Sequence, residues 1–129
     1  LKGGVGKLMA GARRSENAMQ LADTALEMKH GRRGGFRKEN TTLVVVATNA
    51  RLEKAQAIKL AQLAQNGVAR AVSPAHTMFD GDLVVALSLG AADADVNALG
   101  VAAAEAAAAA IVRAVRLAPT LGGVPGLAG

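Results

Sequence analysis

Apolar and polar positions in the second part of the chain follow two alternating patterns. Residues 42–48 form a continuous β-branched and apolar run, which is typical of a strand covered on both faces. Residues 83–89 repeat that pattern, and Gly90 is expected to end the second strand. Residues 53–72 and 94–117 instead carry apolar side chains at helical spacing. The alternation of strand, helix, strand and helix predicts an α/β fold.

The first part of the chain reads differently. Residues 16–29 are predicted to form a helix capped by Ser15, because apolar positions recur there at helical spacing: Ala18, Leu21, Ala22, Ala25 and Met28. Residues 30–40 are rich in Gly and Arg and are expected to form an exposed connection. A peptide bond in such a connection would be accessible to cleavage.

Composition refines the picture of the core. The chain has 129 residues, of which 51% are hydrophobic, yet it contains two Phe and no Trp or Tyr. Eight alanines lie between Ala102 and Ala110 in the last predicted helix. We therefore expect small side chains to bring helices close to a Val-rich sheet, in one small domain or part of one.

Charge and residue types narrow the classes of partner. The net charge is +5, but six of the cations lie in the glycine-rich region without aromatic residues for base stacking: Arg13, Arg14, Lys29, Arg32, Arg33 and Arg37. We expect no nucleic-acid partner. The apolar stretch 98–112 is short and contains Glu105, so no membrane partner is expected either.

Two residue counts bear on cofactors and compartment. The absence of cysteine excludes disulfides, thiolate metal sites and cysteine nucleophiles, and it favours a cytoplasmic location. The two histidines are too few for a convincing metal site. These counts give no support for a metal site.

The junction of Asn40, Thr41 and Thr42 with the first predicted strand carries candidate chemistry. Threonine is a poor nucleophile unless a base lies beside it, and an N-terminal threonine can use its own α-amine, whose pKa is roughly 7.7 to 8.0. Attack of the Thr41 hydroxyl on the Asn40 carbonyl would create that amine by internal cleavage. The plainer interpretation is that Asn40 belongs to a turn and the threonines begin a strand.

A second candidate is the sequence Asp80-Gly81-Asp82 at the start of the second strand. Two carboxylates that flank a glycine could orient an ammonium group through charge-assisted hydrogen bonds. The alternative is a turn with exposed acids. His76 is interpreted as a loop histidine rather than a base, and Asn49 as a turn or helix-cap residue.

These segments together resemble one family. The matching runs are NTTLVVVATNARL at residues 40–52, KAQ at 54–56, HT at 76–77 and DGD at 80–82. In order and spacing they resemble the L-aminopeptidase/D-esterases, β-peptidyl aminopeptidases and nylon-oligomer (6-aminohexanoate oligomer) hydrolases, a family of self-processing N-terminal-nucleophile hydrolases. Threonine at the junction makes the chain look more like the nylon-oligomer hydrolases than the serine-type aminopeptidases.

The resemblance implies a function and a site. Thr41 would be the nucleophile and Asn40 the residue released at the cut, with Asp80 and Asp82 near the nucleophile. The substrate would be a small peptide or amide oligomer hydrolysed through an acyl-enzyme.

The resemblance also implies an architecture. A layered αββα sandwich would place helices on both faces of two sheets. Residues 1–40 would end the larger subunit and residues 41–129 would form the smaller one, in a homo-oligomer of processed heterodimers. The resemblance also implies that no metal and no organic cofactor is needed.

One feature of the family is missing from this chain. The larger subunit of the family contributes a Lys and an Asn to the site, and the segments that carry them have no counterpart here. The stretches 1–6 and 8–14 resemble parts that relatives separate by a strand and a loop. We therefore expect the sequence to be part of a longer enzyme, with an N-terminal portion and a segment near Lys7 missing.

Two other functions compete with hydrolysis. Residues 2–7, KGGVGK, imitate a ParA-like phosphate-binding loop, but Leu8 stands where Ser or Thr should hold Mg²⁺. A non-catalytic, Ala-rich assembly module, or the remnant of a hydrolase, is the other alternative. It predicts no internal cut.

Overall fold

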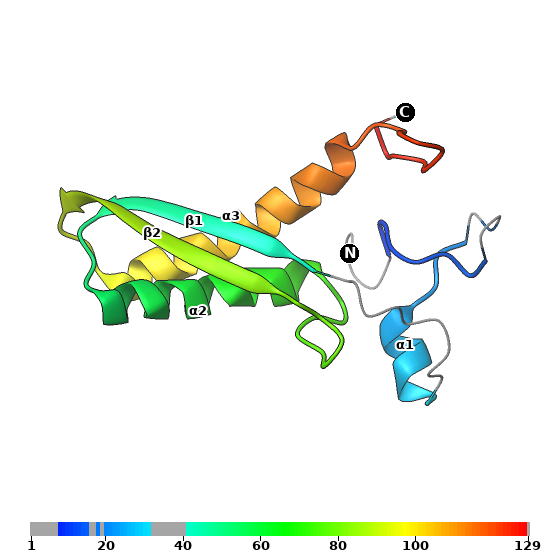
Figure 1. Ribbon diagram of the computed structural model, residues 1–129, viewed down its shortest axis with the longest axis horizontal. Coiled ribbons are helices and arrows are strands. Elements are labelled where there is room, and N and C mark those ends of the chain that lie inside the picture. The colour runs from blue at the N-terminus through cyan, green and yellow to red at the C-terminus, as the bar shows by residue number, and fades with distance from the viewer. Residues whose placement is uncertain (1–7, 16–17, 19, 32–40, 129) are drawn as a thin grey trace.

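The protein is described by a computed structural model that covers residues 8–15, 18, 20–31 and 41–128 (Figure 1). Its centre is a pair of parallel strands, β1 (Leu43–Ala50) and β2 (Leu83–Ala92). The helix α2 (Lys54–Ala71) connects the two strands, and α3 (Val96–Leu117) follows β2. A short helix, α1 (Thr24–Lys29), precedes the sheet. The predicted order of strand, helix, strand and helix is confirmed.

The two strands pair in a regular register over most of their length. Leu43 lies opposite Leu83, and the pairing continues to Thr48 opposite Ser88. An irregularity after Thr48 shifts the register, so that Ala50 pairs with Ala92. The prediction that Gly90 ends the second strand is wrong, because the bulged pairing carries β2 on to Ala92.

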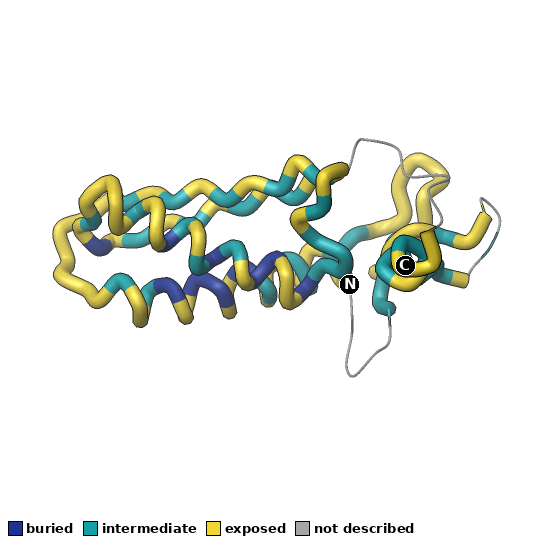
Figure 2. Tube along the Cα trace, turned by 90° about the horizontal axis from the view of Figure 1, so that it is seen from below, coloured by how far each residue is buried: buried dark blue, intermediate teal, exposed yellow. Residues whose placement is uncertain are grey.

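Only one face of this sheet is covered by the described part of the chain. Residues alternate between half-buried and exposed along both strands, as Figure 2 shows. The covered face packs Val46, Val84 and Ala86 against the buried side chains of Leu60, Ala64 and Ala103. The other face, called the open sheet face below, consists of Leu43, Val45, Leu83, Val85, Leu87 and Leu89. The prediction of strands covered on both faces is therefore wrong for the described residues, because they supply a single helical layer.

The helical layer is held together by small residues. The helix α3 packs mainly on α2 rather than on the sheet. A side chain at Gly67 of α2 would collide with the carbonyl oxygen of Ala104 and the methyl group of Ala107. The alanine-rich sequence of α3 thus serves close helix–helix contact, whereas the sequence predicted contact with the sheet.

The N-terminal region departs from its prediction. Arg13 pairs with Leu21 in an antiparallel bridge, and the N–H of Arg14 donates to the carbonyl of Gln20. These backbone bonds exclude a helix at Gln20 and Leu21, and α1 begins at Thr24, with Asp23 rather than Ser15 as its N-cap. Residues 16, 17 and 19 of the predicted helix lie outside the described residues. The carboxylate of Asp23 accepts from the N–H of Leu26 at 3.1 Å.

One helix of the described chain, α3, is long and apolar enough to cross a membrane by length and composition alone. It is longer than the apolar stretch on which the sequence prediction rested. Core helices of soluble proteins pass the same test, and the buried residues of α3 contact α2: Gly100, Ala103, Ala104 and Ala107. The absence of a membrane partner stays a prediction.

Candidate active site

A cavity of about 420 Å³ lies at the N-terminal ends of the two strands. Its walls include all three predicted catalytic residues, Thr41, Asp80 and Asp82, together with Thr42 and Phe79. The N-terminal region supplies further wall residues: Leu8, Ala10, Gly11, Ala12, Ala22, Thr24 and Met28. Of the predicted cleavage site, Asn40 lies outside the described residues, as does the glycine-rich loop of residues 2–7.

The sheet register brings the two chain segments together. Thr42 and Asp82 each directly precede a strand, and Leu43 and Leu83 begin the paired register. The Oδ1 atom of Asp82 accepts a hydrogen bond from the N–H of Thr42 at 2.9 Å. Asp82 therefore binds the backbone next to Thr41, across 40 residues of sequence.

The carboxylate of Asp82 is largely removed from solvent. Its side chain is 5% exposed, and its Oδ2 atom accepts from the N–H of His76 at 3.2 Å. Burial by itself would raise the pKa of Asp82, but the hydrogen bonds from Thr42 and His76 outweigh it. The pKa of Asp82 is therefore held below its ordinary value of 3.8. Asp82 is an ionised acceptor at neutral pH rather than a proton donor.

His76 is a site residue that the sequence analysis did not assign. Its backbone has φ 58°, in the left-handed region, and its Nδ1 lies 3.2 Å from Oδ2 of Asp82. The same Nδ1 lies 3.0 Å from Nε2 of Gln65 on α2. If Nδ1 of His76 carries a proton, it can donate to the Asp82 carboxylate. If Nδ1 carries a lone pair, it can accept from the side-chain amide of Gln65. Asp82 and Gln65 thus compete for one ring nitrogen.

Asp80 shapes the loop before β2. Its Oδ2 accepts from the N–H of Thr77 at 2.8 Å, while its own N–H donates to the carbonyl of Thr77 at 3.1 Å. These two bonds close a tight turn. The sequence alternative is a turn with exposed acids. Asp80 does close a turn, but neither Asp80 nor Asp82 is fully exposed.

A metal centre has no support in the described residues. No group of three His, Asp or Glu side chains there lies close enough to hold a metal ion. The expectation that the enzyme uses no metal stays a prediction, because this search covers only the described residues.

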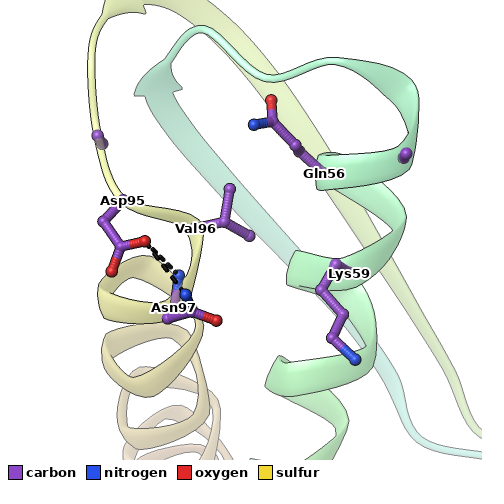
Figure 3. Close-up of a pocket in the computed structure, with 7 residues that line it drawn as sticks. Gln56, Lys59, Asp95, Val96 and Asn97 are labelled. Atoms are coloured by element: carbon purple, nitrogen blue, oxygen red, sulfur yellow. Dashed lines mark hydrogen bonds between the residues drawn. The ribbon is translucent and has the colours of Figure 1, made fainter.

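A second hollow, of about 460 Å³, lies at the other end of the sheet, where α2 and α3 begin (Figure 3). Asp95 is the N-cap of α3 and accepts from the N–H groups of Asn97 and Ala98. Its carboxylate therefore caps the N-terminus of α3. This hollow is separate from the cavity that contains Thr41.

Comparison with known proteins gives first a class and then a family. The sequence profile of peptidase family S58 matches residues 3–128, which is nearly the whole chain. That profile describes a class of peptidases, which hydrolyse amide bonds. The chain belongs to peptidase family S58.

Curated relatives point in the same direction. An uncharacterized aminopeptidase of Mycobacterium leprae is 40% identical over 101 residues, which cover 67% of this chain and 28% of the relative. Uncharacterized aminopeptidases of Mycobacterium bovis and Mycobacterium tuberculosis are 37% identical and are covered to 29%. The chain thus spans less than a third of these relatives. No solved structure matches the chain.

Proposed function

We propose that the full-length protein is a self-cleaving N-terminal-threonine amide hydrolase of peptidase family S58, with Thr41 as nucleophile. The observation that carries the proposal is the hydrogen bond from the N–H of Thr42 to the buried carboxylate of Asp82, at the wall of a cavity. This bond holds the backbone beside the candidate nucleophile. The names of the relatives favour an aminopeptidase.

The first reaction is self-cleavage. The Thr41 Oγ attacks the Asn40 carbonyl carbon, the C–N bond breaks as the C–O bond forms, and the hydroxyl proton passes to the departing nitrogen. Water then hydrolyses the ester, which releases the carboxylate of Asn40 and regenerates the Thr41 hydroxyl beside a free α-amine.

The second reaction is turnover. The α-amine takes the proton from Thr41 Oγ as it attacks a substrate amide, and returns that proton to the leaving amine. Water then cleaves the acyl-enzyme. Asp80 and Asp82 line the same cavity, and their carboxylates would attract the ammonium form of the new N-terminus. Candidate substrates are α-peptides, β-peptides and ω-amino-acid oligomers, including nylon oligomers.

The open sheet face supports a layered architecture for the whole enzyme. Thr41 alternates in phase with Leu43 and Val45, so the candidate nucleophile lies at the edge of this apolar face. We propose that a second sheet from the larger subunit covers it, as in an αββα sandwich. Residues 1–40 would end that subunit, and residues 41–129 would form the smaller one.

The same proposal specifies assembly. The larger subunit would supply the Lys and Asn that complete the site, and processed heterodimers would form a cytoplasmic homo-oligomer. Non-catalytic assembly is the competing proposal, and the test below separates the two.

The test is the intact mass of the full-length protein under denaturing conditions. We expect a small fragment that begins with Thr41 and, if the chain ends at Gly129, contains the 89 residues that follow residue 40. Thr41→Ala should leave one uncut, inactive species, and Thr41→Ser should retain some cleavage.

Thr120→Ala is the matched control, because Thr120 lies beyond α3 and outside the cavity. It should be cut like the wild type. An uncut wild-type protein, or cleavage of Thr41→Ala, would contradict the proposal and favour the assembly module.

A further inference from the structure

We propose that Gly81 is a positioning residue whose missing side chain leaves the space occupied by the Thr41 hydroxyl. This inference rests on the proposed function. In the sequence Asp80-Gly81-Asp82, the two carboxylates would fix the backbone, and the glycine between them would leave room for the Thr41 side chain.

The gap is visible in the packing of Gly81. A Cβ atom added to Gly81 would lie 2.8 Å from Oγ1 of Thr41, and 3.8 Å from its Cβ and Cγ2. Real Cβ atoms essentially never approach a heavy atom within 3.0 Å. The backbone of Gly81 is not in the left-handed region. Glycine is therefore required at this position by space and not by conformation.

The sheet register explains why the gap faces the nucleophile. Leu43 pairs with Leu83, and Thr42 is bound to Asp82. One step further from the strands, Thr41 comes to lie beside Gly81. Side chains of adjacent residues in neighbouring strands point to the same side of the sheet, roughly 4.8 Å apart. A methyl group at residue 81 would therefore point at the Thr41 side chain.

Both flanks of Gly81 are held in place. The Asp80 carboxylate binds the N–H of Thr77 at 2.8 Å, and the Asp82 carboxylate binds the N–H of Thr42 at 2.9 Å. Moving the Gly81 backbone away from Thr41 would disturb these bonds. Rotation of the Thr41 hydroxyl is the easier response to an added methyl group.

Such a rotation would remove the hydroxyl from its attacking position. Threonine is β-branched, so its χ1 has few low-energy rotamers and the hydroxyl would move by a whole rotamer. A misplacement of about 1 Å slows an oriented attack by roughly 100-fold. Gly81→Ala should therefore slow self-cleavage by about that factor.

The experiment measures self-cleavage rates by intact mass in the full-length protein and its Gly81→Ala variant. Thr41→Ser provides the matched background, because serine lacks Cγ2 and turns its hydroxyl more freely. We expect Gly81→Ala to slow cleavage by about 100-fold beside Thr41, and by clearly less in the Thr41→Ser background.

Melting temperatures supply a readout that does not depend on activity. Gly81→Ala should lower the melting temperature of the otherwise unchanged protein, but leave that of Thr41→Ala nearly unchanged, because Thr41→Ala removes the atoms that collide. If Gly81→Ala fails to fold, recovery of folding in the double variant with Thr41→Ala would support the inference, and continued misfolding would overturn it.

The outcomes separate this inference from the proposed function. A wild-type protein that stays uncut contradicts the function, and the inference falls with it. If the wild-type protein is cut and Gly81→Ala is cut at the same rate, only the role of Gly81 is contradicted. The same conclusion follows if Gly81→Ala slows cleavage equally beside Thr41 and Thr41→Ser, or lowers the melting temperature equally beside Thr41 and Thr41→Ala.

Discussion

At the scale of single residues, Asp82 links the candidate chemistry to the fold. Its carboxylate accepts hydrogen bonds from two backbone N–H groups, those of Thr42 and His76. A hydrogen bond to a charged acceptor stabilises a protein by about 1.5 to 3 kcal/mol. Asp82 should therefore matter for stability as well as for activity.

The pH dependence of this contribution follows from the lowered pKa of Asp82. A carboxyl group whose pKa is lower in the folded than in the unfolded state stabilises the protein above its unfolded value, and this stabilisation is lost as pH falls through the folded value. We expect Asp82→Asn to destabilise the protein by about 1 to 3 kcal/mol at pH 7. The difference from wild type should shrink below pH 3.8.

Urea unfolding of the full-length protein at several pH values measures this difference. Asp93→Asn is the control, because the Asp93 side chain is 91% exposed and its ion pair with Arg51 is a surface contact. A destabilisation by Asp82→Asn that is the same at low and neutral pH would show that the charge of Asp82 is not responsible.

The sequence identified which residues could take part in the chemistry, but not what each of their side chains contacts. Thr41, Asp80 and Asp82 could be named from the motif and its resemblance, and they line one cavity. The hydrogen bond that anchors the Asp82 carboxylate comes from Thr42, 40 residues earlier in the chain. His76 was missed because its contact with Asp82 requires a left-handed backbone that no local pattern announces.

At the scale of elements, the close contact between α2 and α3 depends on glycine and alanine residues, which have no side chain or a small one. Alanine normally stabilises a helix interior by about 1 kcal/mol relative to glycine. At Gly67 the added methyl would lie 2.8 Å from the Cβ of Ala107 and would also press on the Ala104 carbonyl. Close packing should therefore reverse the usual sign of this substitution.

We expect Gly67→Ala to destabilise the full-length protein by about 1 to 3 kcal/mol, the usual range for overpacking. Asn66→Ala is the matched control, because Asn66 is exposed on the same helix and alanine is the better helix former. Thermal unfolding of both variants gives the answer. A stabilising Gly67→Ala would mean that the two helices separate without loss.

At the scale of the whole molecule, the open sheet face is an apolar surface that the described residues leave exposed. Leu43 is 71% exposed and Val45 is 65% exposed, and both lie on the strand that Thr41 precedes. Large apolar patches of this kind mark surfaces that another element covers. The proposed sandwich places that element in the larger subunit.

A charge on this face tests the proposed layer. We expect Val45→Asp to prevent correct assembly of the full-length protein, with loss of soluble yield and of self-cleavage, because an unpaired carboxylate would be buried between sheets. Ala69→Asp is the control, because Ala69 is exposed on α2. Soluble, cleaved Val45→Asp protein would show that the face stays open to solvent.

Local patterns in the sequence determined the order and approximate bounds of β1, α2, β2 and α3, because apolar periodicity and capping residues act within a few neighbours. They also identified the junction at Thr41. Tertiary structure decided which face of the sheet is covered, where α1 begins, which backbone groups the Asp82 carboxylate binds and why a glycine lies beside Thr41. Those properties arise from pairing between segments that are distant in sequence, and no local pattern contains the partner.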